Sequence, residues 1–228
     1  MLRWGWLLVG IVLGQATPAS CGEKPQPPTA NEIKTLIDGL VSPNPAPDTR
    51  ALKGGEAKPD LGFPKDFDHK KQAQVHRACV KLTELGPRAF PFLIERWEDK
   101  PYCLTTEVAA YDNQTVGVIC RWIIDDQLQP YGRFQKGYAD PRGKPLRPGY
   151  AATFLASQMA ARQWWGKNKD KTLSQIQLEV LDWVIAEEAK RPGDFTDEER
   201  RELQDLREKL VKGGKPLPPG GIPVYAGR

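Results

Sequence analysis

The stretch of the chain best suited to bind a charged ligand is residues 129–151, QPYGRFQKGYADPRGKPLRPGYA. It contains five cationic side chains, one anionic side chain and several aromatic rings, and its glycines and prolines exclude a regular helix. The candidate binding residues are Arg133, Lys136, Arg142, Lys144, Arg147, Tyr131, Phe134 and Tyr138. They could hold an anionic polymer or an acidic protein. The simpler interpretation, which we favour, is a connector whose rings pack on helices while its cations remain in water.

Histidine and serine, frequent members of catalytic and metal sites, are scarce in this chain. The two histidines, His69 and His76, are seven residues apart, which is wider than the spacing of a zinc-binding pair on a helix. No serine lies in a G-x-S-x-G motif. Cys79 follows His76 by three residues, but a core cysteine beside a partly exposed histidine explains this pair better than a catalytic dyad. We expect no catalytic residue, no metal and no cofactor.

Two pairs of carboxylates, Asp125 with Asp126 and Glu187 with Glu188, are the remaining candidates for acid–base chemistry. Glycoside hydrolysis needs two carboxyl groups that flank one sugar bond. Neighbouring residues on a helix point about 100° apart, so neither pair is arranged for this chemistry by itself. A hydrolase of an envelope polymer, with carboxylates brought together by folding, is therefore the alternative function.

The N-terminus has the features of a secretory signal peptide. A short positive start, Met1–Arg3, precedes the ten-residue run WGWLLVGIVL and small residues that suit cleavage after Ala16 or slightly later. An uncleaved anchor fits less well, because a run of this length spans about 15 Å as helix, half of the hydrocarbon core. A lipid anchor on Cys21 is a further alternative, although Pro18 stands where lipoproteins usually have leucine. We predict a periplasmic or extracellular protein without a transmembrane helix in the mature chain.

After export, the three further cysteines would be in an oxidising compartment, where disulfides can form. They are Cys79, Cys103 and Cys120. Cys103 and Cys120 could form a disulfide across a short loop, although the sequence does not choose among the pairings. Cys79 and Cys120 also lie in apolar helical patterns, so buried free thiols explain them equally well.

The chain has 228 residues, a formal charge of +4 and 39% hydrophobic residues. A domain of this length buries about 70% of its unfolded surface and needs no metal or disulfide to fold. Nucleic-acid-binding domains usually concentrate much more positive charge on one face, so we expect no nucleic-acid partner. The expected partner is an envelope protein or an anionic polymer.

Apolar residues recur at helical spacing in seven segments, and no segment shows convincing strand alternation. Thr29, Thr172 and Thr196 are each followed three residues later by Glu or Gln, which is the spacing of a capping box. The predicted helices are 29–41, 68–85, 87–97, 115–129, 151–165, 172–185 and 196–212.

The segment ACVKLTELGPRAFPFLIERWED, residues 78–99, resembles one HEAT repeat. In that family an apolar helix ends in a Leu-Gly turn, and the next helix begins with a small residue, an apolar residue and proline ahead of a Leu-Ile pair. The matching positions are Ala78, Leu82, Leu85, Gly86, Ala89, Pro91, Leu93, Ile94 and Asp99. The resemblance implies stacked helical hairpins. The order of segments also resembles that of exported bacterial proteins with such helices, which implies no particular activity.

The predicted fold class is all-α, with antiparallel helical hairpins in a short HEAT-like or irregular α-bundle arrangement and long Pro- and Gly-rich loops. The expected organisation is a signal peptide at 1–20, a linker at 21–28, a single helical domain at 29–212 and an extended tail at 213–228. The expected function is that of an exported, non-enzymatic interaction or scaffold protein of the cell envelope. The alternatives are the hydrolase and polyanion binding through residues 129–151.

Overall fold

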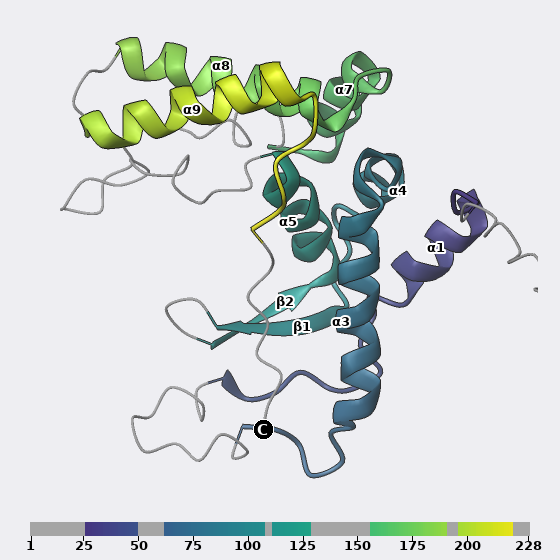
Figure 1. The fold of residues 1–228 in the computed structure, drawn as a ribbon. Helices are drawn as coiled ribbons and strands as arrows, with labels where there is room; N and C mark the ends of the chain where they lie inside the picture. The colour runs from purple at the N-terminus through teal and green to yellow at the C-terminus, as the bar shows by residue number, and fades with distance from the viewer. Residues whose placement is uncertain (1–25, 50–61, 108–110, 129–155, 191–195, 221–228) are drawn as a thin grey trace, which may run out of the picture.

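The computed structural model describes residues 26–49, 62–107, 111–128, 156–190 and 196–220. This part of the chain is mostly helical, as predicted. Figure 1 shows the α-helices and a two-stranded antiparallel sheet, with a short 3-10 helix, η1, between α3 and α4. The elements are α1 (Ala30–Asp38), α3 (His69–Glu84), η1 (Gly86–Arg88), α4 (Phe90–Glu95), β1 (Tyr102–Glu107), β2 (Tyr111–Thr115), α5 (Val116–Leu128), α7 (Gln158–Asn168), α8 (Leu173–Lys190) and α9 (Asp197–Gly213).

Several predictions concern residues outside the described part of the chain. These are the signal peptide at 1–20, the lipidation candidate Cys21 and the basic loop at 129–151. Among the described helices, none combines the length and the apolar character that crossing a bilayer requires.

The hairpin of β1 and β2 corrects the prediction that the chain has no strand. In β1 the side chains of Cys103, Leu104, Thr105 and Thr106 are all buried, with exposed fractions of 2% or less. Apolar and polar residues therefore do not alternate as they do in a half-exposed strand. A register irregularity between Tyr102 and Leu104 also interrupts the two-residue period. Strand β1 is buried because α3 and α5 both pack against it, whereas β2, which α5 also contacts, is partly exposed.

The described helices pack on one another in succession (Figure 1). Helix α1 packs against α3 and α4, α3 packs against α5, α5 packs against α8, and α8 packs against α9. Helix α4 also contacts α7. A single hydrophobic cluster runs from Ile33 in α1 to Leu210 in α9, so these segments share one core.

Helix α5 is buried on nearly all sides and lies at the centre of this core. It approaches the turn after α4 closely, because a Cβ atom at Gly117 would lie 2.4 Å from the carbonyl oxygen of Trp97. The Gly117 N–H instead donates to the carbonyl of Asp99 at 3.0 Å. Glycine at position 117 therefore permits α5 to approach the backbone of Trp97 closely. The buried residues of α5 include Val116, Ile119, Cys120, Ile123, Ile124 and Leu128.

Helices α8 and α9 form an antiparallel pair at the opposite end of the molecule from α1 (Figure 1). Arg200 donates to Glu188 near the connection between the helices, and Arg207 donates to Asp182 farther along, at 3.1 and 2.6 Å. Helix α8 has a wide apolar surface and contacts α5 as well as α9.

The predicted helix starts hold where a capping side chain marks them, whereas α1 ends at Asp38 and not at residue 41, and α8 continues to Lys190, beyond the predicted residue 185. The capping boxes of Thr29 and Thr196 are formed, and Thr172 exchanges the same hydrogen bonds with Gln175. The helix predicted from residue 151 begins instead at Gln158, because Ser157 accepts a hydrogen bond from Ala160 N–H and caps it. The helix predicted over 87–97 is reduced to η1 and the short α4.

Candidate interaction surface on α3

Helix α3 is amphipathic and exposes a largely polar face, on which Val80 is also exposed. It begins at Asp68, whose carboxylate accepts a hydrogen bond from the Lys71 backbone N–H at 3.0 Å. This bond lowers the pKa of Asp68. The buried face of the helix, which packs against α1, β1 and α5, consists of Gln72, Val75, Ala78, Cys79 and Leu82. The residues on the opposite face are exposed to solvent.

A polar network fixes the position of α3 against the preceding chain and the hairpin. The side chain of Asn44 accepts from Asp68 N–H at 2.9 Å and donates to Asp68 C=O at 3.0 Å. Ser42 donates to Gln72, and Gln72 donates to the carbonyl of Cys103 at 2.8 Å. Because Asn44 and Gln72 are buried, these bonds are shielded from water. The exposed face of α3 is therefore presented by a helix whose N-terminal turn is held in place.

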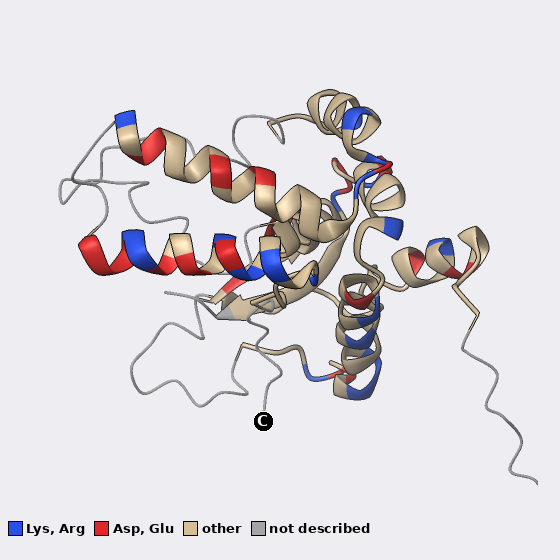
Figure 2. Cartoon of the chain, turned by 45° about the horizontal axis from the view of Figure 1, so that its top comes forward, with Lys and Arg blue, Asp and Glu red and all other residues tan. Residues whose placement is uncertain are grey.

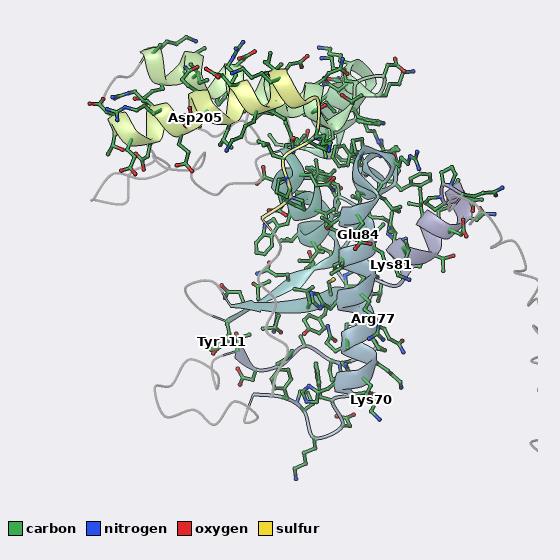
Figure 3. All side chains as sticks on the ribbon, in the orientation of Figure 1. Lys70, Arg77, Lys81, Glu84, Tyr111 and Asp205 are labelled. Atoms are coloured by element: carbon green, nitrogen blue, oxygen red, sulfur yellow. The ribbon has the colours of Figure 1, made fainter. Side chains whose placement is uncertain are left out.

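The exposed face carries Lys70, Arg77 and Lys81, which are labelled along α3 in Figure 3. The spacings of seven and four residues place all three on one side of the helix. Within the described residues none of the three makes an ion pair, whereas their neighbour Lys71 lies 3.7 Å from the Asp68 carboxylate. Glu84 is the only acidic residue of α3 and lies at its C-terminal end. The face therefore has an excess of positive charge over about 16 Å of helix.

Charge is distributed unevenly over the molecule (Figure 2). Helix α3 has four basic and one acidic residue, whereas α8 and α9 together have ten acidic and six basic residues. Several cations of α8 and α9 are also paired with acids, among them Lys190 with Glu187 and Lys212 with Glu208. The basic face of α3 and the acidic helical pair thus lie on different parts of the protein.

A hollow of about 210 Å³ lies between α8 and α9. It is mainly apolar, and the ion pair of Glu188 with Arg200 lies at its wall. The Glu188 side chain is only 6% exposed, and Arg200 also donates to Asp197 at 2.6 Å. The lining residues are Ile185, Glu188, Ala189, Arg200, Leu203 and Gln204. The ion pair of Glu188 in α8 with Arg200 in α9 joins the two helices.

Asp125 and Asp126 are adjacent in α5, but their carboxylates have different surroundings. Burial, and secondly the charge of Asp126, raise the pKa of Asp125 to about 6. Asp126 accepts a hydrogen bond from the Gly220 backbone N–H at 3.1 Å. Asp126 therefore ties the segment that follows α9 to α5.

Comparison of the chain with protein families, curated proteins and solved structures gives no match.

The sequence-predicted site residues have different outcomes. The eight candidate residues of the basic loop lie outside the described part of the chain, as does Cys21. Cys103 and Cys120 are both buried free thiols, so the disulfide considered for them is not formed in this structure. The candidate loop and the basic face of α3 are therefore separate segments.

Sequence reasoning missed the basic face of α3, although a signal for it was present. The helix over residues 68–85 was predicted, and Lys70, Arg77 and Lys81 have the spacing of one helix face. The basic binding site was predicted at residues 129–151 instead, because cations are denser there along the sequence. Projecting the charges of each predicted helix onto its exposed face would have found the stripe.

Proposed function

We propose that this protein is a non-enzymatic interaction protein of the cell envelope that binds an anionic polymer through the basic face of α3. The observation that carries the proposal is the row of Lys70, Arg77 and Lys81, exposed and without ion pairs among the described residues. A row of positively charged side chains suits a linear polymer that carries phosphate or carboxylate groups at regular intervals. The predicted signal peptide supports a location where such polymers occur.

The rest of the helical body acts in this proposal as a scaffold that holds α3 in place. A HEAT-like arrangement over residues 78–99 is part of the proposal. It is supported by the Leu85-Gly86 turn, in which Gly86 adopts a φ of 61° and ends α3. The buried bonds of Gln72 and Asn44 support the same role, because they keep the helix rigid beneath its basic face.

The experiment measures retention of the full chain on immobilised inorganic polyphosphate over a salt gradient, with neutral dextran as the blank matrix. We expect retention on polyphosphate that weakens steeply with salt, because each contact releases counterions. The variant Lys70→Gln/Arg77→Gln/Lys81→Gln should bind about tenfold or more weakly at about 50 mM salt. Unchanged retention of this variant would contradict the proposal.

A matched variant separates the face of α3 from a simple effect of net charge. Arg133→Gln/Lys136→Gln/Arg142→Gln removes the same number of positive charges from the basic loop. We expect it to bind nearly as well as the unmodified chain. If it loses as much affinity as the α3 variant, binding follows net charge alone, and if it loses more, the loop is the binding segment. Either result overturns the assignment to α3.

A further inference from the structure

The two histidines of the chain, His69 and His76, lie beside the basic face of α3. Each immediately precedes a cation of that face, in the pairs His69-Lys70 and His76-Arg77. Because the pairs are seven residues apart, which is nearly two helical turns, both imidazoles lie on the same side of the helix. Both side chains are exposed. The row of cations therefore has two further basic groups along one of its edges.

The two imidazoles are free to meet an anion. The His69 ring contacts the rings of Phe63 and Phe67, with ring centroids 5.3 and 5.0 Å apart. These contacts hold the ring at the first turn of α3. Within the described residues His76 makes no ring contact, and neither histidine makes a hydrogen bond or an ion pair. A bound anion would therefore displace no protein partner from either ring.

The charges close to the histidines come mainly from α3 itself, which carries Lys70, Lys71, Arg77, Lys81 and Glu84, and from Asp68 at its start. Helices α1 and α5 and strand β1 pack on the buried face of α3. The titratable side chains of these elements and of the segments before α3 are Glu32, Lys34, Asp38, Asp48, Lys65, Asp66, Tyr102, Cys103, Glu107, Cys120, Arg121, Asp125 and Asp126. Among those that the structure describes, none forms an ion pair or a hydrogen bond with either histidine.

We propose that His69 and His76 belong to the polymer-binding face of α3 and make its affinity depend on pH. This inference rests on the function proposed above. Histidine side chains in general change charge between pH 5 and 8. Protonation of both would add two positive charges to the three of Lys70, Arg77 and Lys81. An imidazolium also donates through both ring nitrogens, and its charge strengthens hydrogen bonds to phosphate or carboxylate oxygens.

Polymer binding and protonation reinforce each other in this arrangement. A polyanion binds the protonated form of the face more tightly than the neutral form, so binding takes up protons, and protons in turn strengthen binding by the same factor. Acidic conditions should therefore increase the affinity of the face. Alkaline conditions should leave the affinity that its three permanent cations provide.

The test measures the affinity of the full chain for immobilised inorganic polyphosphate at pH 5.5 and pH 8. The internal phosphates of this polymer are ionised at both pH values. At about 50 mM salt we expect binding about threefold or more tighter at pH 5.5. The slope of log affinity against log salt should also be steeper by about 1–2 at pH 5.5, because up to two more cations release counterions. Equal affinity at the two pH values would overturn the inference.

Two matched variants assign the effect to the histidines. His69→Gln/His76→Gln should bind like the unmodified chain at pH 8 and should lose the gain at pH 5.5. His69→Lys/His76→Lys carries both charges permanently and should bind tightly at both pH values. Circular dichroism at each pH checks that the variants fold. If the full pH dependence survives in a folded glutamine variant, it comes from other groups, such as Asp125, and the histidines have no part in it.

The same measurements separate this inference from the function on which it rests. If the unmodified chain binds at pH 8 and the variant Lys70→Gln/Arg77→Gln/Lys81→Gln does not, the proposed function holds whatever the effect of pH. Equal affinity at pH 5.5 then overturns only the role of His69 and His76. Absence of retention at both pH values overturns the proposed function and this inference together.

Discussion

The side-chain amide of Gln177 in α8 binds both backbone groups of Leu217, in the segment after α9. Its oxygen accepts from Leu217 N–H at 2.7 Å, and its nitrogen donates to Leu217 C=O at 3.1 Å. The same nitrogen donates to the carbonyl of Gln127 in α5 at 2.7 Å. One buried amide thus connects two helices and the tail.

Replacing Gln177 by leucine should destabilise the protein strongly. Gln177→Leu removes all three hydrogen bonds and leaves the backbone groups of Gln127 and Leu217 buried without partners. Each such group costs about 1–3 kcal/mol, so the free energy of unfolding should fall by about 3 kcal/mol or more. Urea unfolding measures the loss, and hydrogen exchange at residues 214–220 should rise. Gln74→Leu, on the exposed face of α3, is the matched control and should change stability by less than about 0.5 kcal/mol. An equal effect of both changes would show that the Gln177 bonds contribute little.

Adding one methyl group at each of two glycines should have opposite effects. Gly117→Ala places a Cβ atom 2.4 Å from the Trp97 carbonyl oxygen, so backbone must move, and we expect a loss of about 2–3 kcal/mol. Gly166 lies in α7 with no atom within 4 Å of an added Cβ. Gly166→Ala should therefore raise stability by about 0.5–1 kcal/mol, because alanine favours helix. Thermal unfolding of both variants checks the signs, and a stabilising Gly117→Ala would show that α5 does not pack as described.

The α3 variant that tests polymer binding should remain folded. Arg77 and Lys81 are like charges four residues apart on one helix, an arrangement that costs about 0.2–0.5 kcal/mol. The change Lys70→Gln/Arg77→Gln/Lys81→Gln relieves this repulsion and removes no ion pair of the described residues. Its stability should equal or slightly exceed that of the unmodified chain at low salt, as measured by urea unfolding. A loss above about 1 kcal/mol would mean that the side chains support the fold, and weaker binding could not then be assigned to charge.

Asp125 should make stability fall as the pH rises from about 4 to about 6. Its pKa is raised from 3.8 to about 6 in the folded protein. Between these values the folded state holds a proton that the unfolded state has released, so rising pH favours unfolding. The contribution is fully present below pH 3.8 and is lost above about pH 6, and it amounts to about 3 kcal/mol at most.

The measurement compares urea unfolding of the unmodified chain and Asp125→Asn at pH 4, 5, 6 and 7. The difference between the two proteins isolates Asp125 from the other carboxyl groups. We expect the variant to gain stability relative to the unmodified chain as the pH rises through this range. A difference that does not change with pH would refute the raised pKa.

The parts of the fold that could be predicted are those fixed by local chemistry. Thr29, Thr196 and Asp68 mark helix starts through side-chain bonds to residues three positions ahead, which are readable in the sequence. The hairpin could not be predicted, because burial of both faces of β1 removes the alternation that identifies strands. The bond of Gln177 to Leu217 spans 40 residues and depends on packing that no local pattern reports. The basic face of α3 was readable in principle, since it follows from helix periodicity and the positions of three cations.

Within the described part of the chain, the separation of basic α3 from the acidic pair α8 and α9 sets up an electric dipole. Near a negatively charged surface this dipole experiences a torque before any contact is made. The protein would therefore arrive with α3 leading and with α8 and α9 pointing outward. Its orientation on arrival would weaken as the screening length falls below the size of the molecule, from about 30 Å at 0.01 M salt to about 10 Å at 0.1 M salt.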